Sequence, residues 1–297
     1  MLHWKQLEIH IDKNLAEPLG DLLTGLGALA ITLVDAEDHP IFEPDLGETP
    51  YWEKMILLAL FAEEDNPSLQ LNTAAKILNL NPLPTYQVKL LKEKDWQNQW
   101  KKFLKPRCYA NKLWVVPTGC QPPVLEAQQK MIQINPGLAF GTGSHPTTSL
   151  CLQWLAEHLK PQQTVIDYGC GSGILAIAAL ALGAEQVYAI DHDDQALAAT
   201  LENAKLNHVD KKKLAILKHA NSINTRVDII VANILLQPLI ELLPVFDKLS
   251  QKNTGKVIFS GVLSAQEQQL KDKMLAFFQY VNSQTEKNWI LLEGMHV

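Results

Sequence analysis

The pattern with the clearest chemical meaning in this chain is a run of three glycines flanked by two carboxylates. The glycines alternate with other residues and are Gly169, Gly171 and Gly173. Asp167 precedes them at the end of an apolar stretch, and Asp191 follows the next apolar stretch, roughly 20 residues further on. Glycine reaches positive φ in tight turns and lets ligand atoms approach bare backbone, while a carboxylate at that distance suits ribose hydroxyls. The spacing therefore predicts a nucleoside-binding site.

The residues around the turn distinguish between the cofactors that bind such sites. The dinucleotide pattern G-x-G-x-x-G fails at Ile174 when read from Gly169, and from Gly171 it survives only with Ala176 in the third place. The pattern D-x-G-x-G-x-G fits fully, with Asp167 first. That carboxylate would repel a pyrophosphate at the helix N-terminus, but it suits a ligand with positive charge or amino groups. S-adenosyl-L-methionine carries a sulfonium and an amino group and no phosphate, so we favour it over NAD.

A second glycine-rich stretch, residues 136–148, runs into a helix and contains a candidate base, His145. Thr147 and Thr148 place hydroxyls beside the exposed N–H groups of the first helical turn, where a ligand's carboxylate can bind. The alternative is simple N-capping by Ser144. His145 could accept a proton from a substrate, although a single histidine in a loop is more often structural.

Asn233 ends another predicted strand and offers a substrate amine both an acceptor and a donor while staying neutral. Methyl transfer to nitrogen requires the amine lone pair to point at the methyl group, so the enzyme has to supply orientation and proximity. A lysine ammonium must first lose its proton, and desolvation lowers the pKa of such a group. Asn233 is therefore the candidate catalytic residue, with His145 as a possible base.

The first part of the chain, residues 1–92, is predicted to form a small α+β domain. Its elements follow the order β-α-β-β-α-β, at residues 5–11, 15–26, 30–34, 55–61, 69–80 and 86–91. That order is typical of the ferredoxin-like sandwich, although residues 55–61 could equally be helical. Residues 93–105 then predict a polar linker helix, in which Trp96, Trp100 and Phe103 share one face and which Pro106 ends.

Residues 106–297 alternate between strand and helix patterns, which predicts an α/β domain with a mostly parallel sheet covered by helices on both faces. Strands are expected at 113–116, 131–134, 164–167, 186–190, 214–217, 227–232 and 256–260, with two more within 280–292. Helices are expected to begin at residues 147, 174, 194, 236 and 265, and the last of them is expected to extend to residue 278. Ligands bind at the carboxyl ends of such strands, where Asp167, Asp191 and Asn233 converge.

Composition limits the classes of partner and compartment. With 297 residues, 47% hydrophobic and 20% charged, the chain is typical of globular proteins, and no apolar stretch is long enough to span a membrane. Four scattered cysteines without a C-x-x-C pair favour a reducing cytoplasm and argue against a metal site. Residues 1–92 hold 6 Lys/Arg and 14 Asp/Glu, a net charge of −8, which opposes nucleic-acid binding and would attract a basic protein.

Three long motifs, LAFGTGSHPTT, VIDYGCGSGILAIAALALGA with AIDHD, and VANILLQPL, make the chain resemble the PrmA family of bacterial ribosomal protein L11 methyltransferases. DWQNQWKKFLKP resembles that family's linker helix. The resemblance implies a class I Rossmann-like methyltransferase domain hinged to an N-terminal substrate-recognition domain. It implies cofactor contacts at Thr148, Gly169, Asp191 and Asn233.

The resemblance implies that the protein uses S-adenosyl-L-methionine to methylate lysine side chains and the N-terminal amine of ribosomal protein L11, a protein of the large subunit. Residues 1–92 match the family by layout more than by motif. Three alternatives remain at this point: methylation of another protein or of RNA, an NAD-dependent oxidoreductase, and a non-catalytic ribosome-binding factor. A monomer is expected.

Overall fold

The computed structural model describes residues 3–37, 51–92, 105–135 and 145–297. The chain divides into two compact units, Met1–Gln99 and Trp100–Val297. The predicted linker helix, with Trp96, Trp100 and Phe103, lies outside the described residues except for its end at Lys105. Each unit is described by itself.

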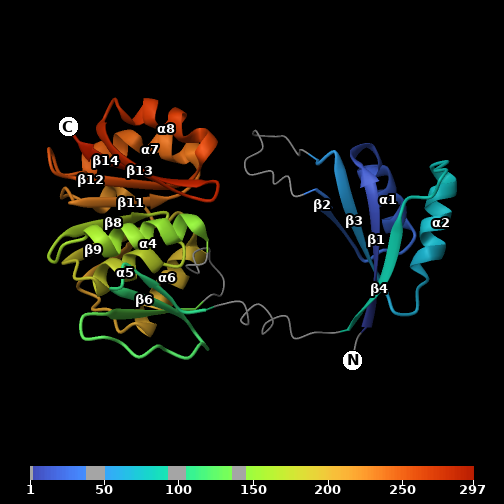
Figure 1. Cartoon of the computed structure of the whole chain (residues 1–297), viewed down its shortest axis with the longest axis horizontal. Coiled ribbons are helices and arrows are strands. Elements are labelled where there is room, and N and C mark those ends of the chain that lie inside the picture. The colour runs from blue at the N-terminus through green and yellow to red at the C-terminus, as the bar shows by residue number, and fades with distance from the viewer. Residues whose placement is uncertain (1–2, 38–50, 93–104, 136–144) are drawn as a thin grey trace. The chain divides into compact units, whose positions relative to one another are not determined.

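The smaller unit is a four-stranded antiparallel sheet with two helices on one face (Figure 1). Its elements are β1 (His3–Asp12), α1 (Ala16–Gly25), β2 (Ala30–Asp35), β3 (Lys54–Ala62), α2 (Pro67–Ile77) and β4 (Tyr86–Lys92). The strand order β2-β3-β1-β4 is the ferredoxin-like order, and the stretch that could have been helical is strand β3. Alternate residues of β1 and β3, such as Leu7, Ile9 and Leu57, are fully buried beneath the helices.

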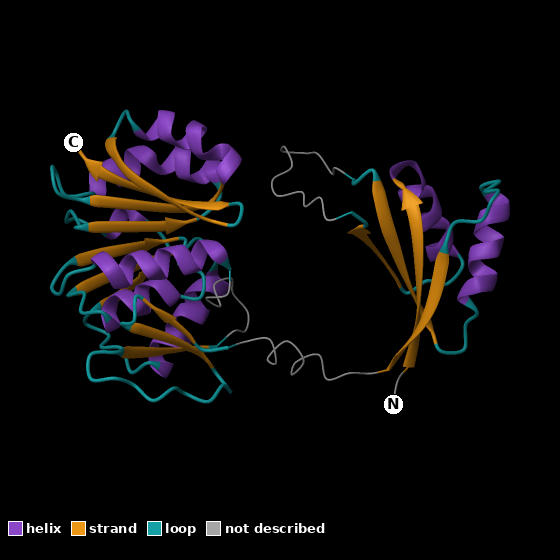
Figure 2. Cartoon of the chain, viewed as in Figure 1, coloured by secondary structure: helices purple, strands orange, loops and turns teal. Residues whose placement is uncertain are grey.

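The larger unit is built on a seven-stranded sheet in the order β10-β9-β8-β11-β12-β14-β13. Figure 2 shows the strands of this unit in orange and its helices in purple. Its strands are β8 (Thr164–Tyr168), β9 (Gln186–Ile190), β10 (Leu214–Leu217), β11 (Ile229–Asn233), β12 (Lys256–Leu263), β13 (Phe278–Glu286) and β14 (Trp289–His296). Neighbouring strands from β10 to β12 are parallel, whereas β14 runs antiparallel to both β12 and β13. The carboxyl ends of the parallel strands therefore meet at one edge.

Helices cover both faces of this sheet and enclose two hydrophobic cores. The helices are α4 (Pro146–His158), α5 (Ile174–Ala181), α6 (Asp194–Leu206), α7 (Leu236–Leu249) and α8 (Glu267–Met274). The first three share one core, which includes Trp154 and Ile177, and the last two share the other, which includes Phe246 and Leu270. The α/β architecture is thus as predicted.

Two expectations about the larger unit are wrong. The strands expected at 113–116 and 131–134 do not join the main sheet but form a separate one with an unpredicted strand, in the order β5 (Arg107–Tyr109), β6 (Leu113–Pro117) and β7 (Lys130–Ile134). β7 instead packs against α5 and α6. The helix expected to begin at residue 265 is also shorter, since Phe278 is buried as the first residue of β13.

Candidate functional site

The glycine-rich turn joins β8 to α5, as the sequence predicts. Gly169, Gly171 and Gly173 have φ angles of 75°, 53° and 75°, a region that other residues rarely adopt. The N–H groups of Gly169 and Cys170 both donate to the carbonyl of Ile190, at 2.8 and 2.9 Å. These two bonds fix the start of the turn against the end of β9.

Neighbouring side chains make two of these glycines sterically necessary. A Cβ atom at Gly169 would overlap Cγ2 of Ile234, and a Cβ at Gly173 would lie 2.7 Å from Cγ2 of Thr200. Both positions are therefore closed to larger residues by packing as well as by backbone conformation. Gly169 and Gly171 line a cavity, whereas Gly173 does not line it and is the N-cap residue of α5.

Asp191 lies directly after β9 and holds the turn from the other side. Its Oδ2 atom accepts a hydrogen bond of 2.9 Å from the N–H of Gly171, and its Oδ1 atom accepts one of 3.0 Å from the N–H of Asp193. A carboxylate has about four acceptor positions, so two hydrogen bonds leave capacity for ligand hydroxyls. This geometry fits the predicted contact with a ribose.

Asp167 is buried against the start of α5 and is not among the residues that line the cavity. Its side chain is 1% exposed, and Oδ2 accepts a 2.9 Å hydrogen bond from the N–H of Ala176 in the first turn of α5. Within the described residues Oδ1 has no hydrogen-bond partner. The pKa of the Asp167 carboxyl is raised to about 7, mainly by burial. The nearby Asp191 also raises this pKa, whereas the hydrogen bond from Ala176 lowers it.

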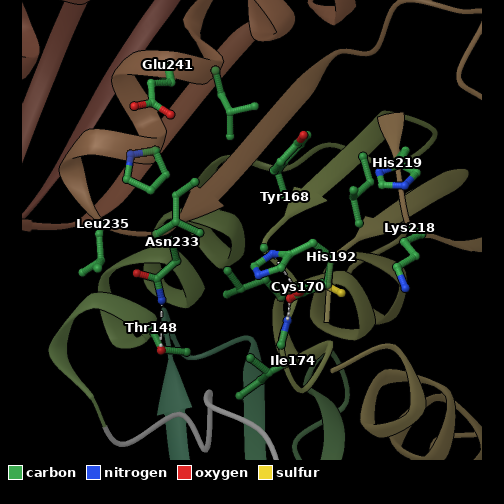
Figure 3. Close-up of a pocket in the computed structure, with 18 residues that line it drawn as sticks. Thr148, Tyr168, Cys170, Ile174, His192, Lys218, His219, Asn233, Leu235 and Glu241 are labelled. Carbon is green, nitrogen blue, oxygen red and sulfur yellow. Dashed lines mark hydrogen bonds and ion pairs between the residues drawn. The ribbon is translucent and has the colours of Figure 1, made fainter. Parts of the chain in front are cut away.

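Asn233 and Thr148 also line the cavity, and their side chains contact each other. Asn233 ends β11, and its Nδ2 atom donates to Oγ1 of Thr148, in the first turn of α4, over 3.3 Å (Figure 3). The Oδ1 atom of Asn233 is buried and has no partner within the described residues. Since buried polar atoms are rarely left unpaired, this acceptor indicates a ligand group.

His145 caps the N-terminus of α4 and is not among the cavity-lining residues. Its Nδ1 atom lies 2.8 Å from the hydroxyl and 3.4 Å from the N–H of Thr147, and its ring packs edge-on against Trp289. Burial lowers the pKa of His145, with Glu286 acting in the opposite direction. Residues 136–144, including Ser144 and most of the second glycine-rich stretch, lie outside the described residues.

The cavity at this edge of the sheet has a volume of about 560 Å³, within the usual range for small-ligand sites (Figure 3). Of the predicted site residues, Thr148, Gly169, Gly171, Asp191 and Asn233 line it. Most of the remaining lining was not predicted from the sequence, and it includes Tyr168, His192, Lys218, His219, Leu235 and Glu241. Four of these residues, His192, Lys218, His219 and Leu235, lie within two residues of the ends of β9, β10 and β11, and this position is the signal that could have identified them.

Cys170 also lines the cavity but is not an activated nucleophile. Its Sγ atom lies 3.4 Å from Oγ1 of Thr200, and burial raises the pKa of the thiol well above its usual value. In the described part of the chain no group of three His, Cys, Asp or Glu side chains could hold a metal ion. None of the described helices is both long and apolar enough to cross a bilayer.

Comparison with known proteins places these features in a family. The family model for ribosomal protein L11 methyltransferase (PrmA) matches residues 3–296. The ribosomal protein L11 methyltransferase of Nitrosococcus oceani is 41% identical over 98% of both chains, and that of Cellvibrio japonicus is 40% identical over the same share. A solved structure of ribosomal protein L11 methylase from Lactobacillus delbrueckii subsp. bulgaricus is 34% identical with a TM-score of 0.60, covering 65% of this chain and 99% of that one. The chain therefore belongs to the ribosomal protein L11 methyltransferase family.

Proposed function

We propose that this protein transfers methyl groups from S-adenosyl-L-methionine to lysine side-chain amines and the N-terminal amine of ribosomal protein L11. Membership of the family supports the methyltransferase activity and the ribosomal substrate. One observation supports the choice of amines as acceptors: the Oδ1 atom of Asn233 at the cavity wall is buried and has no partner among the described residues. A neutral acceptor oxygen can receive an N–H of an amine without stabilising the ammonium form as strongly as a carboxylate would.

The residues at the glycine turn fit S-adenosyl-L-methionine. The absence of a side chain at Gly169 and Gly171 leaves backbone exposed to the cavity, and Asp191 retains acceptor capacity for two ribose hydroxyls. Most of the lining is apolar, which suits an adenine ring. When bound, this cofactor supplies an electrophilic methyl group on a sulfonium.

A dinucleotide fits the same site poorly. A pyrophosphate would use the N-terminal N–H groups of α5, and one of them, that of Ala176, is already bonded to Asp167. Asp167 therefore favours a cofactor without phosphate through its position at the helix start, rather than through contact with the ligand. This observation and the family argue against the oxidoreductase alternative.

Asn233 and Thr148 would orient the acceptor amine. The hydroxyl of Thr148 accepts from Nδ2 and so fixes the orientation of the amide, whose buried Oδ1 has no partner among the described residues. Orientation of this kind raises the rate because the amine lone pair is directed at the methyl group. Apolar residues around Asn233, such as Leu235 and Pro238, would lower the pKa of an entering lysine by desolvation. The role of His145 as a base stays a prediction.

The smaller unit would recognise the protein substrate. Residues 1–92 carry a net charge of −8, which would attract a basic ribosomal protein and repel RNA. We further propose a cytoplasmic monomer without direct nucleic-acid binding, in which the segment 93–105 lets one site reach several amines.

Two measurements test this function. Calorimetry with S-adenosylhomocysteine and with NADH compares the cofactor classes, and we expect binding of the first alone. Incubation with methyl-labelled S-adenosyl-L-methionine and purified ribosomal protein L11 should then label that protein. Cofactor binding without label in L11 would instead indicate another substrate or a non-catalytic ribosome-binding factor.

A further inference from the structure

Helix α6 turns a stripe of polar side chains toward the interior of the larger unit. Thr200, Asn203 and Asn207 are spaced three and four residues apart, so they lie on one side of the helix. Thr200 is fully buried and Asn203 is 2% exposed. A polar stripe in a place normally taken by apolar side chains requires hydrogen-bond partners.

On one side, the partners of this stripe are carbonyls of the glycine turn. The hydroxyl of Thr200 donates to the carbonyl of Gly171 over 3.0 Å, and Nδ2 of Asn203 donates to the carbonyl of Ser172 over 2.8 Å. Because each peptide is planar and trans, fixing a carbonyl also fixes the N–H of the following residue on the opposite side. The two side chains thus set the orientation of two successive peptides in the turn.

On the other side, the partners belong to β7 and the residue after it. Oδ1 of Asn203 accepts from the N–H of Asn135 over 2.8 Å. Asn207 bonds both backbone groups of Gln133, accepting from the N–H over 2.7 Å and donating to the carbonyl over 2.6 Å. Of the three residues, only Asn203 has partners on both sides within the described parts of the chain. From Asn135, nine residues of chain lead to His145 and the start of α4.

We propose that Thr200 and Asn203 are positioning residues for methyl transfer, which hold the glycine turn in its cofactor-binding conformation and, through Asn203, tie the turn to β7. This inference rests on the proposed function, in which that turn holds S-adenosyl-L-methionine. Neither residue lines the cavity, so both act through the backbone of residues 171 and 172. Asn207 bonds β7 and the carbonyl of Asn203 within its own helix, and none of its bonds reaches the glycine turn.

The stripe offers a matched pair of isosteric variants, Asn203→Asp and Asn207→Asp. Each keeps the Oδ1 acceptor and loses the Nδ2 donor. Asn203→Asp places a carboxylate oxygen against the carbonyl of Ser172 in the glycine turn, whereas Asn207→Asp places one against the carbonyls of Gln133 and Asn203, away from the turn. We expect Asn203→Asp to raise the Kd for S-adenosylhomocysteine about tenfold or more, and Asn207→Asp to change it less than about twofold. The KM for S-adenosyl-L-methionine should rise in parallel with Kd, while kcat at saturation changes less.

A second pair covers the case in which Asn203→Asp does not fold. Thr200→Val keeps the shape of the side chain and removes the hydroxyl, whereas Thr200→Ser keeps the hydroxyl that donates to Gly171. Thr200→Val should weaken binding of S-adenosylhomocysteine by about fivefold, and Thr200→Ser should retain it to within about twofold. Urea unfolding of all four variants gives the loss of stability against which each change in affinity is compared.

The outcomes separate this inference from the function on which it rests. Equal weakening by Asn203→Asp and Asn207→Asp, in proportion to lost stability, would assign the stripe a purely structural role and overturn the inference. Unchanged affinity in both Asn203→Asp and Thr200→Val would overturn it as well, with the proposed function intact. A wild-type protein that binds no S-adenosylhomocysteine would refute the proposed function and this inference together.

Discussion

At the scale of single residues, the proposed methyl transfer depends on one amide whose two ends have different roles. Nδ2 of Asn233 is held by Thr148, and Oδ1 has no partner among the described residues. Replacing Asn233 with Ala should lower kcat for methylation of ribosomal protein L11 about 100-fold, because the amine loses its orienting acceptor. The Kd for S-adenosylhomocysteine, measured alongside by calorimetry, shows whether cofactor binding changes too. Transfer that survives with cofactor binding unchanged would deny Asn233 a chemical role.

Thr148 provides a graded control for the same contact. Thr148→Val removes the hydroxyl that accepts from Asn233 and should lower kcat about tenfold, whereas Thr148→Ser should retain most activity. Rates at saturating concentrations of both substrates give this comparison. If the two substitutions reduce the rate equally, the hydroxyl is not what orients Asn233.

Asp167 makes the stability of the protein depend on pH in a defined direction. Burial raises its pKa from 3.8 to about 7, so between these values the folded state binds more protons than the unfolded state. The contribution of Asp167 to the free energy of unfolding therefore falls as pH rises from about 4 to 7 and is constant above. Asp167→Asn should remove this component. Urea unfolding across that range tests it, and a difference between the two proteins that does not vary with pH would contradict the assignment.

Single positions also mark the limit of what the sequence can predict. The motif indicated that Asp167 belongs to the site, but not that its side chain is buried against α5 and does not line the cavity. Alternation along β8 explains the difference: Asp167 points to the face covered by α5, while Tyr168, one residue later, lines the cavity. Which of two adjacent side chains meets a ligand depends on which face is covered, and that is a tertiary property.

At the scale of elements, the turn between β8 and α5 is constrained by packing as well as by ligand binding. Gly169→Ala should lower the free energy of unfolding by ~1–3 kcal/mol and abolish measurable cofactor binding, because its Cβ would overlap Ile234 at a positive φ. Gly119→Ala is the matched control, since Gly119 also has a positive φ, of 88°, and its Cβ would meet nothing within 4 Å. Thermal unfolding and calorimetry measure both effects, and equal behaviour of the two variants would refute this explanation of Gly169.

The positions of the helices and strands could largely be predicted from apolar periodicity, but which strands pair with one another could not. The five parallel strands of the main sheet lie close to the expected positions, because buried parallel strands form short apolar stretches between helices. Residues 113–116 and 131–134 have the same pattern, yet they form a separate sheet with β5. A strand pattern specifies local conformation, whereas the choice of neighbouring strand depends on packing, here of β7 against α5 and α6.

At the scale of the whole molecule, charge is divided unevenly along the chain. Residues 1–92 carry a net charge of −8 and the remainder +2, together the −6 of the chain. If the acidic part attracts a basic substrate, kcat/KM for ribosomal protein L11 should fall several-fold as salt rises from low to about 0.5 M. The Kd for S-adenosylhomocysteine, measured over the same range, should change far less. A kcat/KM that is independent of salt would leave the acidic part without a role in attracting the substrate.

We propose above that amines of ribosomal protein L11 are methylated at the cavity formed by the glycine turn and Asn233. Mass spectrometry of peptides from purified ribosomal protein L11, after reaction with labelled S-adenosyl-L-methionine, tests it most directly. We predict label on lysine side chains and on the N-terminal amine with the wild-type protein, and its near loss with Asn233→Ala. Label confined to other atoms, or no label in ribosomal protein L11 from a protein that binds the cofactor, would contradict the claim.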